Sequence, residues 1–258
     1  MLVTGATGGI GIAIARALAA RGAHLILTGR RPEALEPLAD ELGARTIVCD
    51  LSERADVDRL ASDGIGAGVD VLVANAALPA SGLLVDLSQE QIDRMLEVNL
   101  RAPIALARAL APMMTSRGSG HMVFLSSLSG KAASPASSLY SATKFGLRGF
   151  ALGIRADLRT HGVGSSVILP GFVSDAGMFA DAKVKLPPGV GTRTPGDVAE
   201  AVIRAIERNR AEVEVAPLSM RIGASLASVA PGLAAFGSRL LGSDRIATDM
   251  AEGQRDKR

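Results

Sequence analysis

The sequence predicts a single α/β domain with a doubly wound parallel sheet, a Rossmann-type fold. Short apolar runs alternate with longer helical patterns along the chain, as expected when helices connect parallel strands. Most of these runs, such as 69–74, lack alternating polar residues, which is typical of strands covered on both faces. A glycine-rich turn also separates the first apolar run from the first helical pattern. In this fold, ligands bind at the edge formed by the carboxyl ends of the strands.

The individual elements follow from the same patterns and their punctuation. Strands are expected at 2–4, 24–28, 46–49, 69–74, 121–126 and 163–169, with an edge strand at 212–215. Helices are expected at 9–20, 32–42, 53–62, 88–114 with a bend at Pro103, 138–161 and 195–209. Pro32 at a helix start and Gly43 after its end are the expected terminal residues. No repeat or second domain interrupts the series, so residues 1–258 are expected to form one domain.

Composition excludes several classes of protein. The chain has 28 Lys and Arg against 26 Asp and Glu, with 3% aromatic residues and no Trp, which argues against a nucleic-acid-binding surface. No uncharged apolar run is long enough to span a membrane, and no secretory signal opens the chain, so a cytoplasmic protein is expected. The single Cys49 is interpreted as buried strand filler. The three histidines lack ligand spacing, so no metal site is expected.

The turn Thr4–Gly11 has the sequence of a dinucleotide-binding loop. Gly5 allows a tight turn, Gly9 lets the backbone approach a pyrophosphate, and Gly11 permits close contact between helix and strand. The N-terminus of the following helix adds unpaired N–H groups and a positive dipole. Because the turn follows a strand and precedes a helix, the sequence predicts a phosphate-binding site here.

The glycine spacing, Gly-x-x-x-Gly-x-Gly, resembles that of the short-chain dehydrogenase/reductase family, and later motifs occur in the family's order. They are Asn75-Ala76-Ala77, Asn99, Ser127, Tyr140-x-x-x-Lys144 and Pro170-Gly171, and the resemblance covers about residues 1–215. It implies a nicotinamide-dependent enzyme that assembles as a homodimer or homotetramer. Three features depart from the family pattern: Ala77 replaces a Gly, Asp175 replaces a frequent Thr, and little chain precedes the first motif.

Tyr140, the only Tyr in the chain, is the predicted proton donor or acceptor. A free phenol has a pKa of about 10. Lys144 lies one helical turn away, and its ammonium, together with an oxidised nicotinamide, is expected to lower that pKa. By resemblance, Lys144 holds the nicotinamide ribose, Ser127 polarises the substrate oxygen and Asn99 keeps a water in the proton relay. Ser127 is preferred to its serine neighbours because its distance from Tyr140 matches the family spacing.

The expected reaction is NADP(H)-dependent interconversion of a carbonyl and an alcohol, and the alternative is a non-catalytic dinucleotide-binding regulator. NADP(H) is favoured over NAD(H) because Gly29, followed by Arg30 and Arg31, stands where NAD-binding domains place an acidic residue. The alternative is that both arginines are solvated surface charges with no role in cofactor binding. Asp50 is expected to contact the adenine, by resemblance, or to cap a helix beginning near Ser52. The expected cofactor contacts are Thr4, Gly5, Thr7, Gly9, Ile10, Gly11, Arg30, Arg31, Asp50, Leu51, Asn75, Ala76, Tyr140, Lys144, Pro170, Gly171 and Val173.

Two later segments are more apolar than ordinary loops. Residues 173–193 are predicted to form a lid over an apolar small-molecule substrate, since Met178, Phe179, Leu186 and Val190 cluster there. These side chains could instead pack permanently on the 195–209 helix. Residues 216–242 include the charge-free stretch 222–238, interpreted as pocket wall, subunit contact or membrane-surface patch, with packing as the default. The identity of the substrate does not follow from the sequence.

Overall fold

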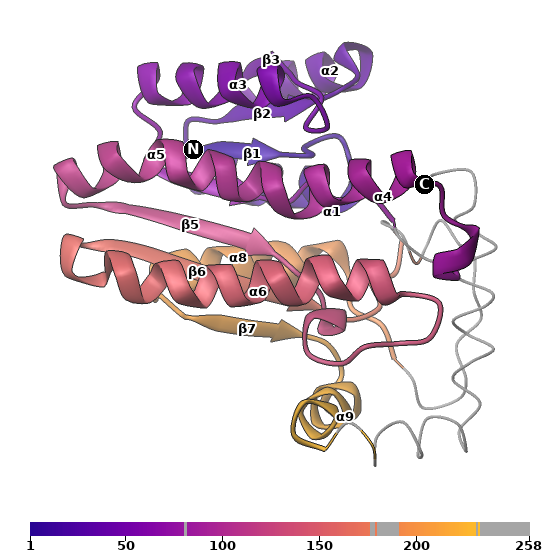
Figure 1. Cartoon of the computed structure of the whole chain (residues 1–258). Coiled ribbons are helices and arrows are strands. Elements are labelled where there is room, and N and C mark those ends of the chain that lie inside the picture. Colours follow the sequence, from indigo (N-terminus) through magenta and orange to yellow (C-terminus); the bar gives the residue numbers. More distant parts are fainter. Residues whose placement is uncertain (80–81, 176–178, 180–190, 231, 233–258) are drawn as a thin grey trace.

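The computed structural model describes residues 1–79, 82–175, 179, 191–230 and 232. Within them, seven strands form one sheet in the order β3-β2-β1-β4-β5-β6-β7, and every neighbouring pair is parallel. In Figure 1 the strand arrows all point toward the same side of the molecule. The predicted doubly wound parallel sheet in one domain is confirmed.

The strands are β1 (Leu2–Thr4), β2 (Ile26–Gly29), β3 (Arg45–Val48), β4 (Val71–Ala74), β5 (Gly120–Leu125), β6 (Val163–Pro170) and β7 (Glu212–Val215). The α-helices are α1 (Gly9–Ala19), α2 (Pro32–Leu42), α3 (Arg54–Gly66), α4 (Gln89–Leu96), α5 (Ala102–Arg117), α6 (Ser138–Leu158), α8 (Pro195–Glu207) and α9 (Leu218–Val229). Short 3₁₀ helices occupy Leu84–Asp86, Leu128–Gly130 and Arg159–His161, and a π-helical turn occupies Glu97–Arg101.

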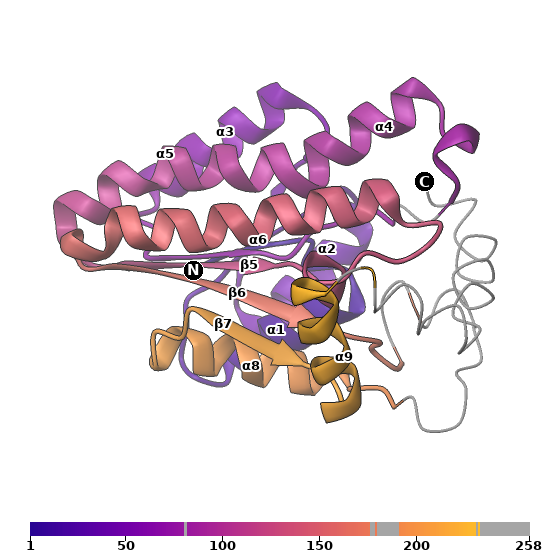
Figure 2. The same ribbon diagram turned by 60° about the horizontal axis from the view of Figure 1, so that its bottom comes forward.

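Helices cover both faces of the sheet, as Figure 2 shows. One apolar core lies beneath α3, α5 and α6 and contains Leu60, Leu110 and Leu147. The other lies beneath α1, α2 and α8 and contains Ile14, Leu35 and Val202. Removing this much aliphatic surface from water is the main term that stabilises the fold.

The predicted helix 88–114 is interrupted, although not by a bend at Pro103. Helix α4 begins with a capping box between Ser88 and Gln91, and the π-helical turn Glu97–Arg101 separates it from α5. Pro103 lies in the first turn of α5, where a proline has no intrahelical N–H bond to remove. The interruption therefore lies before the proline, and it contains Asn99.

The two edges of the sheet differ from its centre. Strands β1, β4 and β6 are buried along their whole length, as predicted from their apolar runs. Strand β3 is an edge strand whose Val48 is 44% exposed, so the prediction that this run is covered on both faces was wrong. Cys49 follows that strand and is buried, and burial raises the pKa of its thiol to about 11. Strand β7 forms the opposite edge, as predicted.

Helix α9 was not predicted as a helix. It occupies most of the described part of the apolar segment 216–242 and lies beyond β7 in Figure 1. In the described part of the chain, no helix has both the length and the apolar character that crossing a bilayer requires.

Candidate active site

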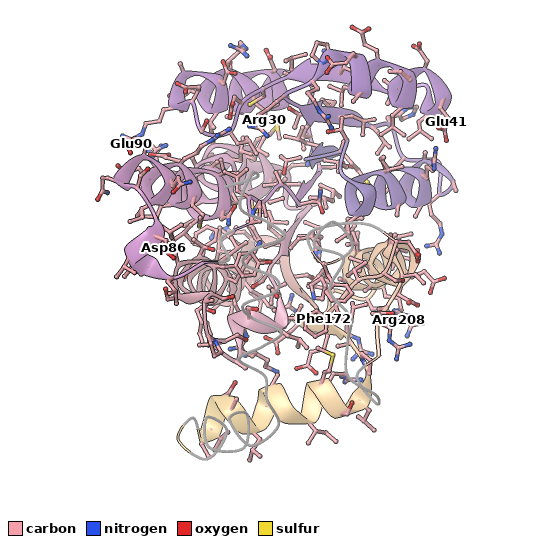
Figure 3. All side chains as sticks on the ribbon, turned by 90° about the vertical axis from the view of Figure 1, so that its right-hand side faces the viewer. Arg30, Glu41, Asp86, Glu90, Phe172 and Arg208 are labelled. Carbon is pink, nitrogen blue, oxygen red and sulfur yellow. The ribbon has the colours of Figure 1, made fainter. Side chains whose placement is uncertain are left out.

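A cavity of about 320 Å³ opens at the carboxyl edge of the sheet, beside the ends of β1 to β4. Its walls are Gly5, Thr7, Gly8, Gly9, Ile10, Gly11, Thr28, Gly29, Arg30, Arg31, Cys49, Asp50, Leu51, Asn75, Ala76, Ala77, Leu78, Pro79 and Val98. Figure 3 looks onto this edge and labels Arg30 on one side and Phe172 on the side toward α9. A pocket of this size suits a small molecule or cofactor.

The glycine turn has no room for side chains at two positions. Gly5 has φ +64°, and a Cβ there would lie 2.8 Å from the Cα of Ala76. A Cβ on Gly11 would lie 2.2 Å from the carbonyl oxygen of Gly5. Both distances are far below van der Waals contact, so the turn can close against β4 and α1 only with glycine at these positions.

Thr4 and Asn75 join the glycine turn to the loop after β4. The Thr4 hydroxyl accepts the backbone N–H groups of Asn75 and Ala76, each at 3.1 Å. The Asn75 amide donates to the carbonyl oxygens of Thr4 at 3.0 Å and Gly5 at 3.1 Å. Thr4 is buried and is not a cavity wall residue, so its side chain supports the turn. The cofactor contact expected of Thr4 remains a prediction.

Arg30, Arg31 and Asp50 line the side of the cavity formed by the ends of β2 and β3. The Arg30 guanidinium lies 3.9 Å from the Asp50 carboxylate and is half-exposed. Burial acts to raise the pKa of Asp50, but hydrogen bonds from Ser52 outweigh it, so the pKa lies below its ordinary value. Asp50 accepts the backbone N–H of Ser52 at 2.9 Å. It does not cap a helix beginning near Ser52, because α3 begins at Arg54 with Glu53 as its N-cap.

Ser127 lies two residues after the end of β5 and is partly buried. Its oxygen accepts the backbone N–H of Ser129 at 3.1 Å and lies 3.5 Å from the carbonyl oxygen of Pro170. The neighbouring Ser126 is buried and donates to the carbonyl oxygen of Lys144 at 2.8 Å. Ser126 is therefore a support for α6, whereas Ser127 is less buried.

Tyr140 and Lys144 face each other across one turn of α6, with the Lys144 Nζ 5.5 Å from the centre of the Tyr140 ring. Lys144 is buried and donates to the carbonyl oxygen of Leu125 at 2.9 Å. Burial lowers the pKa of Lys144 to about 8. Burial also raises the pKa of Tyr140 to about 12, although a hydrogen bond with Ser127 acts in the opposite direction.

The lowered phenol pKa expected from the sequence is thus not found in the protein alone. Sequence spacing places the ammonium of Lys144 near Tyr140, but it does not reveal how strongly burial disfavours the phenolate. The positive charge of an oxidised nicotinamide, the second part of that expectation, is absent from the protein itself. In this state Tyr140 is a protonated phenol, which suits a proton donor.

Asn99 holds the loop after β4. Its side-chain oxygen accepts the backbone N–H of Leu78 at 2.7 Å, and its side-chain nitrogen donates to the carbonyl oxygen of Leu78 at 2.9 Å. Leu78 is a cavity wall residue, so these two hydrogen bonds from the buried Asn99 side chain hold this part of the wall in position. The expected role of Asn99 in a proton relay remains a prediction.

The expected contacts after β6 lie away from the walls of this cavity. The backbone N–H of Gly171 donates to the carbonyl oxygen of Val215 at 3.0 Å. The carbonyl oxygen of Pro170 lies 3.5 Å from the Ser127 hydroxyl. Val173 forms a bridge with Arg193, so the two ends of the predicted lid 173–193 meet. Residues 176–178 and 180–190, including Met178, Leu186 and Val190, lie outside the described residues. Phe179 is described, and its ring centre lies 4.8 Å from that of Phe172.

Several cavity residues were not predicted. Thr28, Gly29 and Cys49 end or follow strands of the sheet, and the rule that ligands bind at strand ends could have found them. Pro79 and Val98 come from a loop and a helical turn that only the tertiary packing brings to the cavity. Among the residues that the structure describes, no cluster of His, Cys, Asp and Glu has the arrangement of a metal site.

The chain is similar to known proteins in both sequence and fold. The family model described as short chain dehydrogenase matches residues 1–186. The ketoacyl reductase HetN of Nostoc is 36% identical over 223 residues, which cover 83% of this chain and 77% of that protein. A solved short-chain dehydrogenase from Sphingobium yanoikuyae in complex with NADPH has a TM-score of 0.77 at 28% identity, covering 91% of this chain and 94% of that chain. The closed form of a serine dehydrogenase complexed with NADP+ has a TM-score of 0.76 at 31% identity, covering 84% and 94%.

Proposed function

We propose that this chain, which belongs to the short-chain dehydrogenase/reductase family, is an NADP(H)-dependent carbonyl reductase in which Tyr140 supplies the proton. The family shows that the chain is an oxidoreductase acting on carbonyl or alcohol groups. The observation that carries the finer proposal is the set Ser127, Tyr140 and Lys144. Ser127 lies just after β5, which is the neighbour of β4, and the end of β4 lines the cavity. A complete set of this kind argues against the alternative of a non-catalytic regulator.

The residues of the cavity fit a dinucleotide. Gly5 and Gly11 let the turn pack tightly against Ala76 and against itself, where a Cβ would collide, and the N-terminus of α1 provides N–H groups for phosphates. Arg30 and Arg31 stand where a ribose 2′-phosphate would lie in this fold. The residue before them is Gly29, and not the acidic residue that would favour NAD(H). Among the residues that the structure describes, the Arg30 guanidinium pairs only with Asp50, at the loose distance of 3.9 Å, so it keeps donors for a phosphate. When bound, the reduced nicotinamide supplies the hydride.

The chain's own residues then handle the oxygen of the substrate. Ser127 donates a hydrogen bond to the carbonyl oxygen and orients it toward the Tyr140 phenol. As two electrons arrive at the carbonyl carbon with the hydride, the O–H bond of Tyr140 breaks and its proton forms the new alcohol O–H. Lys144, with a pKa of about 8, is mainly protonated near neutral pH and stabilises the resulting phenolate.

An apolar substrate is favoured by the surroundings of Ser127. The methyl of Met220 and the side chain of Leu128 both border Gly171, at 3.3 and 3.4 Å from the place a Cβ would take. The ring of the next residue, Phe172, packs against the ring of Phe179. These groups offer no charge to a polar substrate, and each apolar contact contributes through the area that it removes from water.

The reaction is tested by following NADPH oxidation with a panel of small polar ketones, bulky apolar ketones and ketoacyl thioesters. We expect turnover with at least one apolar carbonyl and a higher kcat/KM for NADPH than for NADH. A preference for NADH would contradict the cofactor assignment. Turnover confined to small polar carbonyls would contradict the substrate class but leave the reaction intact.

A further inference from the structure

Helix α9 exposes an apolar face to solvent. Leu218, Ile222, Leu226 and Val229 are 66%, 60%, 55% and 85% exposed. Their spacings of four, four and three residues place them on one side of the helix, within an arc of about 80°. Isolated exposed aliphatic residues are ordinary, but a continuous stripe of them marks an interaction surface.

The opposite face of α9 is fixed to the body of the protein. Ala224 is buried, and Met220 packs against the core beneath α6. The Arg221 Nε lies 2.9 Å from the Glu214 carboxylate, and the Ser228 hydroxyl donates to the carbonyl oxygen of Lys131 at 2.9 Å. The exposed stripe therefore cannot turn inward unless these contacts break.

The charged anchor of α9 is part of a larger network on β7. Glu214 lies between Arg221 and Lys131, and Lys131 also pairs with Glu212 at 2.9 Å. Arg148 of α6 pairs with the other oxygen of Glu212 at 2.6 Å. Partly buried pairs that share partners hold their geometry better than isolated surface pairs do. Figure 3 shows α9 along the border of the molecule.

The size of the stripe argues against a second copy of the chain as its occupant. A helix of 12 residues is about 18 Å long and about 10 Å wide, so one face offers about 180 Å². A stable protein interface buries about 800 Å² on each partner. A lipid surface needs no such minimum, because each side chain that enters it contributes separately.

Charge also favours a lipid surface. From Val215 to Ser243 the chain contains no Asp or Glu, and Arg221 and Arg239 are its only charged residues, so nothing in this stretch repels anionic headgroups. A second exposed apolar group, Leu83–Val85, is followed by Asp86 and Glu90, which would oppose such a surface. The stripe on α9 is therefore the better candidate.

We infer that α9 is an interfacial helix, which lies parallel to a phospholipid bilayer and buries Leu218, Ile222, Leu226 and Val229 among the lipids. The Arg221 guanidinium, half-exposed beside this stripe, stays at the level of the headgroups. The inference is independent of the proposed reaction, because its residues take no part in hydride or proton transfer.

A tryptophan reporter tests this directly, because the chain has no Trp of its own. In Ile222→Trp, the fluorescence maximum is expected to shift to shorter wavelength when vesicles of phosphatidylcholine and phosphatidylglycerol in equal parts are added. Brominated lipids should then quench the emission. The matched control is Ile65→Trp, because Ile65 is 43% exposed on α3, outside the stripe, and should show neither change.

The unmodified chain supplies the second measurement. It should float with the same vesicles in a density gradient, and Ile222→Glu should lower the vesicle partition coefficient by at least about tenfold, whereas Ile65→Glu should leave it unchanged. Failure of the unmodified chain to float would overturn the inference. So would a fluorescence shift of Ile222→Trp that depends on protein concentration without vesicles, because it would identify a second copy as the occupant.

Discussion

The two halves of the carboxyl edge are built on different principles. Around the glycine turn, backbone and small residues form the cavity, and polar Thr4 and Asn75 bind other parts of the protein. Around Ser127, the functional groups are side chains, and burial shifts the pKa values of both Tyr140 and Lys144. The first half should therefore be sensitive to added volume, and the second to the loss of one functional group. Each prediction below tests one side of this contrast.

Tyr140→Phe should have the largest effect on catalysis. It removes only the hydroxyl that we propose as the proton donor, so turnover should fall at least about a hundredfold, as is usual for a lost acid or base. Cofactor affinity should change less than about twofold, because the ring and Lys144 remain in place. Stopped-flow turnover and NADPH titration measure the two quantities. Retention of a tenth of the activity, a barrier change of only about 1.4 kcal/mol, would exclude Tyr140 as the proton donor.

Gly11→Ala should disrupt the other half without touching a functional group. The new methyl would lie 2.2 Å from the Gly5 carbonyl oxygen, so the turn must open at a cost of about 1–3 kcal/mol in unfolding free energy. NADPH affinity should fall at least about tenfold. Gly66→Ala is the control, since a Cβ there meets nothing within 4 Å. Its NADPH affinity should be that of the parent, and its unfolding free energy should be equal or higher by up to about 1 kcal/mol, because alanine is the better helix former. Normal NADPH binding by Gly11→Ala would show that the turn is not the phosphate site.

Arg30→Ala separates the two cofactors. The loss of a charge-assisted contact to phosphate should weaken NADPH binding by about 1.5–3 kcal/mol, roughly ten- to a hundredfold. NADH lacks that phosphate, so its affinity should hardly change. Isothermal titration with both cofactors measures the ratio. An equal loss for both would assign Arg30 to the structure of the β2 end, where it lies 3.9 Å from Asp50.

The smallest effect concerns the pH dependence of stability. Lys144 has a folded pKa of about 8 against an ordinary 10.5, so between these values the unfolded chain binds more protons than the folded one. Stability should therefore rise with pH in that window, by about 1 kcal/mol between about pH 7 and pH 9. Urea unfolding measures it, and Lys144→Met should lack this contribution. A parent curve that falls over the same range, with no difference from Lys144→Met, would contradict the lowered pKa of Lys144.

The local elements of the molecule could be predicted because their causes lie close together in the chain. Pro32 and Gly43 mark the ends of α2, and the structure places that helix at Pro32–Leu42. Gly11 must be glycine because a Cβ there would meet the carbonyl oxygen of Gly5 in the same turn. The pair Tyr140 and Lys144 follows from the period of a helix. The same kind of local signal located the first six strands of the chain to within about two residues.

The remaining features depend on neighbours that are distant in sequence. The predicted strand at 46–49 does not reveal from its sequence that it lies at the edge of the sheet, because edge position is a property of strand order. Asn99 can form its hydrogen bond with Leu78 only because the π-helical turn packs against a loop that lies 21 residues earlier in the chain. The pKa shifts of Tyr140 and Lys144 depend on the groups that pack over them. The stripe of α9 is exposed because no described group packs on that side of the helix. Local sequence sets the backbone's preferences, whereas burial and exposure are decided by the tertiary packing.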